Sequence, residues 1–331
     1  AAEAADSVLV DYTSLPAVTN SRKALSDTAP QLHDEAPGNI VYAWGRGDAA
    51  AADAAIAGAA HTVELDIVNN RVVCAAIETR ACLAVHDTEA GKTTLYDATQ
   101  APHLIRKSVT EALGIPQSEL RVVAPDVGGG FGTKGKHYPE ETIVTWAARR
   151  FGRPVRWIAS RSESFMSDTQ ARDHLTTATL GLDAEGKFVG LRVNTLANVG
   201  AYISTFGASI PGAIYSALLA GVYRTPAVYV DITTVLTNTV PTDAYRGAGR
   251  PEACYVLERL ADEAARALGM DRAEIRRRNL IPVDAMPYAT PIGPVYDSGD
   301  FPNIMEKLLA GADWDGFPAR RAESEARGKL R

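Results

Sequence analysis

Glycines crowd one short stretch of the chain, Gly128–Lys136, which reads GGGFGTKGK around a single aromatic residue, Phe131. Four glycines within residues 128–132 permit positive φ angles and let a bound group approach the main chain very closely. A tight turn alone explains two of these glycines well and all four poorly. The stretch therefore predicts a ligand-binding turn whose position is fixed by Phe131.

Two nucleotide-binding motifs match the same residues. Gly130, Gly132 and Gly135 satisfy the G-x-G-x-x-G pattern of dinucleotide-binding turns, between a predicted strand and a predicted helix. A P-loop pattern fits as far as Lys136, but His137 stands where a Ser or Thr would ligate magnesium. The missing hydroxyl argues against nucleoside-triphosphate chemistry, whereas an NAD(P)-dependent oxidoreductase stays open as an alternative.

A second glycine-containing turn, residues 243–252 (DAYRGAGRPE), carries Arg246 and Arg250. It leaves a β-rich run and enters a helix at Pro251, a common first helical residue. Guanidinium groups at a helix N-terminus attract an anion or an oxygen-rich ligand. An equally open interpretation is that both arginines pair with surface carboxylates.

The elements that must position these turns mix strands and helices. Strands are predicted at 7–12, 40–44, 61–68, 71–77, 81–86, 93–97, 120–124, 155–159, 174–182, 187–197 and 228–237. Helices are predicted at about 48–60, 102–113, 139–150, 252–268, from 271 onward, at 301–309 and over the charged run 319–331. Asn69-Asn70 indicates a hairpin between the third and fourth of these strands. Since strands and helices do not alternate strictly, we predict an α+β fold with mixed β-sheets and packed helices.

Composition excludes several classes of protein. The chain has 331 residues, 46% of them hydrophobic and 22% charged, which is typical of folded domains. A net charge of −6 argues against a nucleic-acid partner, and no apolar run reaches the ~18 residues of a membrane span. The three cysteines show no CxxC spacing, which argues against an iron–sulfur cluster in this chain and favours a reducing compartment. We therefore expect a cytoplasmic protein, with a periplasmic location as the alternative.

Taken together, these stretches resemble the molybdenum-binding large subunit of the xanthine dehydrogenase, aldehyde oxidase and carbon monoxide dehydrogenase family, the molybdenum hydroxylases. The resemblance covers nearly the whole chain. It rests on five stretches in order: Thr99-Gln100, Gly128–Gly132, Arg153–Arg156, Ala244–Gly247 and Asp271–Leu280.

The resemblance implies a molybdenum–molybdopterin cofactor, in the cytosine dinucleotide form, with the metal held through the pterin dithiolene and by no side chain directly. It implies oxidation of an aldehyde or N-heteroaromatic carbon in a small-molecule substrate, with oxygen taken from water. Electrons would pass to 2Fe-2S clusters and FAD on partner subunits. A non-catalytic assembly module of the same fold stays open as a further alternative.

The resemblance also assigns roles to residues. Gln100 would hydrogen-bond an oxygen ligand of molybdenum, and Arg246 would orient substrate or stabilise developing negative charge. The residues expected to line the cofactor are Gly129, Gly130, Phe131, Gly132, Arg246, Gly247 and Ala248. Gly247 stands where the copper-containing carbon monoxide enzyme has cysteine, which argues against carbon monoxide as substrate.

The family's catalytic glutamate lies in a glycine-flanked motif that these 331 residues do not contain. We therefore expect a fragment or split large subunit, inactive alone, whose remaining half supplies the base. Residues 1–38, with prolines 16, 30 and 37, are interpreted as the end of an upstream domain plus a linker. Residues 39–331 are interpreted as the first molybdopterin-binding domain.

Overall fold

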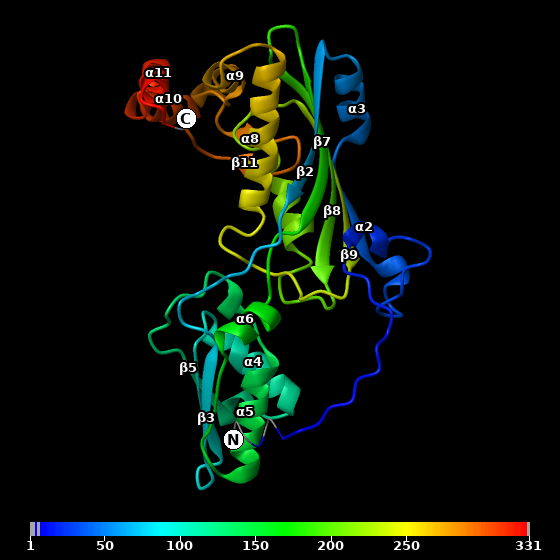
Figure 1. Cartoon of the computed structure of the whole chain (residues 1–331), viewed down its shortest axis with the longest axis vertical. Coiled ribbons are helices and arrows are strands. Elements are labelled where there is room, and N and C mark those ends of the chain that lie inside the picture. Colours follow the sequence, from blue (N-terminus) through cyan, green and yellow to red (C-terminus); the bar gives the residue numbers. More distant parts are fainter. Residues whose placement is uncertain (1–3, 5–6, 330–331) are drawn as a thin grey trace.

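The strands form two main sheets, each in its own lobe, in a computed structural model that describes residue 4 and residues 7–329 (Figure 1). The large sheet has the order β1 (Ile40–Gly47), β9 (Ala227–Leu236), β8 (Phe188–Gly200), β7 (His174–Leu182) and β2 (His61–Asn69). The small sheet has the order β5 (Leu120–Val123), β4 (Lys92–Asp97), β3 (Ala81–Asp87) and β6 (Val155–Ile158). The pairs β8–β9 and β4–β5 are parallel and the other pairs antiparallel, so the prediction of mixed sheets is confirmed.

Helices cover the sheets and bury two separate cores. In the large lobe, α8 (Arg250–Ala267) and α3 (Ala49–Ala57) lie on either side of the strands (Figure 1). In the small lobe, α4 (Pro102–Leu113) and α5 (Pro139–Phe151) pack on the sheet through buried residues such as Ile105 and Val144. The remaining helices and strands are α2 (Ser21–Ala24), α6 (Arg161–Ser167), α7 (Ser216–Leu218), α9 (Arg272–Asn279), α10 (Phe301–Gly311), α11 (Phe317–Ala326), β10 (Tyr288–Ala289) and β11 (Val295–Tyr296). In the described part of the chain, no helix combines the length and apolar character needed to cross a membrane.

The small lobe is an insertion into the large one. β2 and β7 pair along their whole length, from His61 with Leu182 to Asn69 with His174, although about one hundred residues of small lobe separate them in the chain. The two lobes are therefore joined by the segments that follow β2 and precede β7. Because their cores are separate, loops from the two lobes are aligned by these segments and by contacts between the lobes.

Two strand predictions are wrong. Residues 71–77 do not pair with β2. Among the described residues they form one isolated bridge, between Val72 and Ala171, and they lead into the small lobe. The hairpin predicted at Asn69-Asn70 does not form, because these residues only end β2, which pairs with β7 from far along the chain. Residues 7–12 are also not a strand: Leu9 is 95% exposed and makes no sheet pairing.

Candidate functional site

The glycine loop joins β5 to α5, and its shape depends on missing side chains. Gly129 and Gly132 have φ angles of 96° and 104°, and Phe131 itself has φ of 53°. A Cβ atom on Gly132 would lie 2.3 Å from the carbonyl oxygen of Ala244. Only glycine allows this approach, so the loop is built to contact the second turn rather than merely to reverse direction.

The two turns meet where the lobes touch. The backbone N–H of Arg246 donates to the carbonyl oxygen of Phe131 at 2.9 Å. Gly247 and Ala248 follow with φ angles of 96° and 35° and lead the chain into α8. The structure therefore brings together two turns that lie more than one hundred residues apart in the sequence.

Gln100 is bound to the glycine loop through both its side chain and its backbone. Its Oε1 accepts the N–H of Gly132 at 2.8 Å, and its backbone N–H donates to the carbonyl oxygen of Lys134 at 2.8 Å. A Cβ on Gly130 would lie 2.4 Å from this Oε1, so Gly130 makes room for the glutamine. Within the described chain, the Nε2 of Gln100 donates to no acceptor.

Neither arginine of the second turn pairs with a carboxylate of the described residues. The Arg246 side chain is exposed and has no ion-pair or hydrogen-bond partner there, whereas Arg250 donates through Nη1 to the carbonyl oxygen of Gly247 at 3.2 Å. The surface-carboxylate interpretation of these arginines is therefore wrong. The guanidinium of Arg246 stays available to a ligand.

Several donors at this junction have no acceptor among the described residues. Over residues 7–329, the backbone N–H groups of Phe131 and Gly247 have no acceptor, like the Nε2 of Gln100 and the guanidinium of Arg246. Such a set suits an anionic group rich in oxygen. No three His, Cys, Asp or Glu side chains of the described chain stand close enough to hold a metal ion. The unpaired donors of the junction thus suit a bound anionic group.

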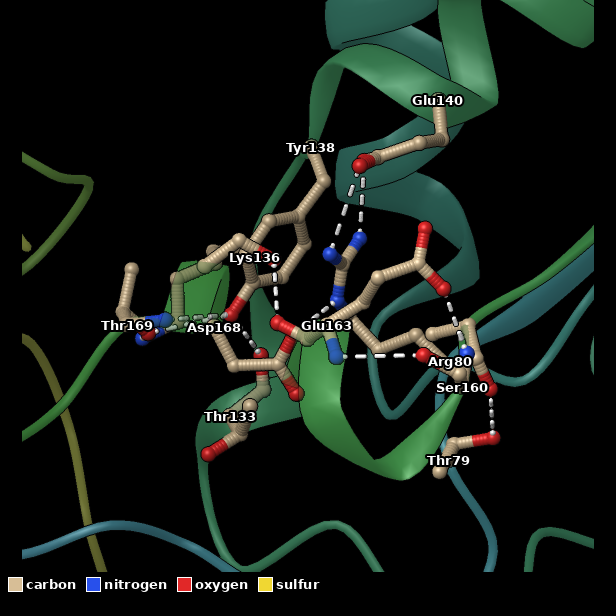
Figure 2. A network of polar contacts seen from close by, with 12 residues as sticks. Thr79, Arg80, Thr133, Lys136, Tyr138, Glu140, Ser160, Glu163, Asp168 and Thr169 are labelled. Atoms are coloured by element: carbon tan, nitrogen blue, oxygen red, sulfur yellow. Dashed lines mark hydrogen bonds and ion pairs between the residues drawn. The ribbon is translucent and has the colours of Figure 1, made fainter. Parts of the chain in front are cut away.

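A buried arginine supports the base of the glycine loop (Figure 2). Arg80 donates to Asp168 at 2.7 Å and to Glu140 at 2.8 Å, and its guanidinium lies 3.7 Å from the ring centroid of Tyr138. The hydroxyl of Tyr138 donates in turn to the carbonyl oxygen of Thr133 at 3.0 Å. This network ties the end of the loop to the lobe junction.

Two further contacts hold the turns, and neither is predicted from the sequence. Glu78 Oε2 accepts from the buried ammonium of Lys134 at 2.6 Å and from the N–H of Gly128 at 2.8 Å, so it joins both ends of the loop. Arg172 donates to the carbonyl oxygen of Arg246 at 3.0 Å and to Glu252 at 2.9 Å. Two lysines alternating with glycines were the available signal for the first contact.

Asp97 ends β4, three residues before Gln100. Burial raises the pKa of Asp97 to about 7, although the positive charges of Arg80 and Lys134 act to lower it. Its Oδ2 is buried without a hydrogen-bond partner among the described residues. A folded-state pKa above the ordinary 3.8 means that the folded chain keeps a proton which the unfolded chain releases. Stability should therefore fall as pH rises from about 4 to about 7.

We expect Asp97→Asn, which stays neutral, to make this slope shallower and to raise the thermal midpoint at pH 8 more than at pH 4. Part of the slope should remain, because burial also raises the pKa of neighbouring Glu141. Thermal unfolding followed by circular dichroism from pH 4 to pH 8 measures the effect. Asp284→Asn changes an exposed carboxylate and serves as the control. An unchanged slope in Asp97→Asn would show that Asp97 is ionised in the folded protein.

The dinucleotide-binding interpretation fails on topology. In that fold the glycine turn opens directly into a helix of a parallel sheet. Here α5 begins only at Pro139, beyond a 3-10 turn over Thr133–Gly135, and β3 is antiparallel to both of its neighbours. The N–H groups of the loop consequently do not form the start of a helix.

Comparison with known proteins places the fold in a family. The molybdopterin cofactor-binding domain matches residues 32–280, which include both turns and Gln100. The chain belongs to the molybdopterin cofactor-binding domain family. This confirms the resemblance to the large subunits of molybdenum hydroxylases, and with it the fold class.

Several members of this family are similar over almost the whole chain. The carbon monoxide dehydrogenase large chain of Hydrogenophaga pseudoflava is 38% identical over 99% of this chain, and the nicotine 6-hydroxylase large subunit of Paenarthrobacter nicotinovorans is 32% identical over 99%. The crystal structure of quinoline 2-oxidoreductase from Pseudomonas putida 86 superposes with a TM-score of 0.91, at 33% identity and 99% coverage. This chain spans only 42%, 40% and 42% of those three chains, respectively.

Proposed function

We propose that this chain is the cofactor-binding part of a molybdenum hydroxylase that oxidises an N-heteroaromatic or aldehyde carbon with oxygen derived from water. The observation that carries the proposal is the junction of the two turns, where Arg246 N–H meets the Phe131 carbonyl at 2.9 Å. Donors without a partner among the described residues lie on both turns and on Gln100. They match the oxygen-rich, anionic chemistry of the family's cofactor.

Each donor has a distinct task in this proposal. When bound, a molybdenum–molybdopterin cofactor would supply the two-electron oxidation. The backbone N–H groups of Phe131 and Gly247 would bind oxygen atoms of the cofactor, and the Nε2 of Gln100 would donate to another. Arg246, whose guanidinium has no carboxylate partner among the described residues, orients the substrate and stabilises negative charge that develops during the reaction.

Other parts of the enzyme complete the reaction. We propose that the proton acceptor comes from the rest of the large subunit, and that electrons leave to 2Fe-2S clusters and FAD on partner subunits. Residues 39–331 would form the first molybdopterin-binding domain, with the small lobe as its insertion, and the cofactor would carry cytosine dinucleotide. The cysteines are all free thiols, which fits the cytoplasm.

Gly247 bears on the choice of substrate. The chain is similar to a carbon monoxide dehydrogenase large chain, but it has no thiol at the turn where the resemblance predicts the copper-binding cysteine. The similarity to proteins named for nicotine and quinoline supports an N-heteroaromatic ring instead. We therefore favour ring carbons next to nitrogen over carbon monoxide.

Turnover by the complete enzyme complex tests this proposal. We expect about one molybdenum per large subunit and incorporation of ¹⁸O from labelled water into a hydroxylated quinoline or pyridine or into an oxidised aldehyde. Oxidation of carbon monoxide should be undetectable. A complex without molybdenum, or one that oxidises carbon monoxide alone, would contradict the proposal.

A further inference from the structure

A buried ion pair joins the two turns at their inner ends. Lys136 follows the glycine loop, and its Nζ lies 3.5 Å from Oδ1 of Asp243, the residue that opens the second turn. The side chains are 1% and 0% exposed. Lys136 also donates to the hydroxyl of Thr169 at 2.5 Å, in the segment that links the lobes (Figure 2).

Asp243 is held on its other sides as well. Its Oδ2 accepts the N–H of Phe206 at 3.1 Å, and its Oδ1 accepts the N–H of Ala244 at 2.5 Å. Its own N–H donates to the carbonyl oxygen of Gln170 at 2.7 Å. Asp243 thus fixes the start of the second turn to the large lobe and to the linking segment.

The pair lies close to both turns that carry the unpaired donors. Lys136 lies five residues after Phe131, and Asp243 lies three residues before Arg246. Since the lobes have separate cores, the alignment of the two turns depends on contacts that cross between them. Burial lowers the pKa of Lys136, and Asp243 opposes that effect. Removing either partner leaves an uncompensated buried charge, which is strongly destabilising.

We propose that Lys136 and Asp243 are positioning residues: their ion pair aligns the Phe131 turn with the Arg246 turn, and thereby aligns the cofactor with Gln100 and Arg246. This inference rests on the proposed function. It differs from a purely structural role because buried ion pairs are often replaceable by neutral groups without loss of stability. If the pair aligns the turns, replacing both residues by neutral ones should restore the stability of the protein but not its turnover.

The test uses the complete complex with Lys136→Met, Asp243→Asn and the double variant. We expect the single variants to unfold at lower temperature. The double variant, with no unpaired charge, should recover its thermal midpoint and its molybdenum. Its turnover number should nevertheless fall about ten- to a hundredfold with little change in KM, since small misplacements of reacting groups have effects of this size.

A second readout reports on the cofactor itself. Partial reduction by substrate should give a Mo(V) electron paramagnetic resonance spectrum that is shifted in the double variant. The matched control is Arg192→Met with Asp53→Asn, which removes an exposed ion pair of the large lobe and should leave turnover and spectrum unchanged.

Two results would overturn the inference. A double variant with the unsubstituted turnover number and spectrum would show that the pair serves stability alone. A double variant that fails to assemble would show that the pair is required for folding rather than alignment. If the unsubstituted complex lacks molybdenum or turnover, the proposed function itself is wrong. The same measurements on the unsubstituted complex therefore distinguish failure of the proposed function from failure of this inference.

Discussion

One methyl group at Gly132 should remove most of the molybdenum from the complete enzyme. The Cβ of Gly132→Ala would lie 2.3 Å from the carbonyl oxygen of Ala244 and 2.8 Å from its carbon, and the backbone φ of 104° is itself unfavourable for alanine. Both clashing atoms belong to the main chain, so the second turn must move away. We expect molybdenum content and turnover to fall to about one tenth or less, as the alignment of the turns is lost.

Gly135→Ala is the matched control for this substitution. It lies three residues further along the same loop, where a Cβ would meet nothing within 4 Å and φ is not positive. Molybdenum content and turnover should be measured for both variants, and circular dichroism should compare their folding. A loss in Gly132→Ala alone would show that the close contact matters, and not merely that the loop tolerates no alanine. Full molybdenum content in Gly132→Ala would contradict the contact between the two turns.

Replacing Gln100 by alanine should lower turnover about ten- to a thousandfold while molybdenum stays bound, since a donor that acts mainly in the transition state is lost. In the structure the Oε1 of Gln100 already accepts from Gly132 N–H, and over the described residues its Nε2 has no protein acceptor. The donor left for the cofactor is therefore Nε2. Steady-state kinetics on the complete complex measure the loss.

Gln100→Glu separates donation from loop support. A carboxylate oxygen can still accept the N–H of Gly132 at this position, but it replaces the Nε2 donor with an acceptor. We expect this variant to be about as slow as Gln100→Ala while keeping the thermal midpoint of the unsubstituted enzyme. Gln117→Ala, at an exposed glutamine, should have no effect. Unchanged turnover in Gln100→Ala would favour the non-catalytic assembly module.

Local signals in the sequence predicted most of the elements. Pro102 and Gly114 bound α4 because proline suits the first helical turn and Gly114 adopts a left-handed conformation with φ of 63°. The hairpin at Asn69-Asn70 failed because β2 pairs with β7, beyond the whole small lobe. A turn signal shows where a strand ends, but the partner of that strand is set by packing between distant segments.

The same division applies to the candidate site. Glycine and arginine have distinctive chemical properties that a sequence shows directly. Gly132 and Arg246, with Phe131 among the glycines, could therefore be singled out from the sequence. Lys134 and Lys136 could not be recognised as buried, since lysine is almost always exposed and its burial here depends on Glu78 and Asp243.

Anomalous X-ray diffraction from crystals of the complete enzyme, collected on both sides of the molybdenum absorption edge, would show whether the cofactor binds where the two turns meet. We expect one molybdenum peak per large subunit at the junction of the two turns, beside the Nε2 of Gln100 and the backbone of Phe131. A molybdenum peak away from both turns, or none in an enzyme that turns over substrate, would contradict this expectation.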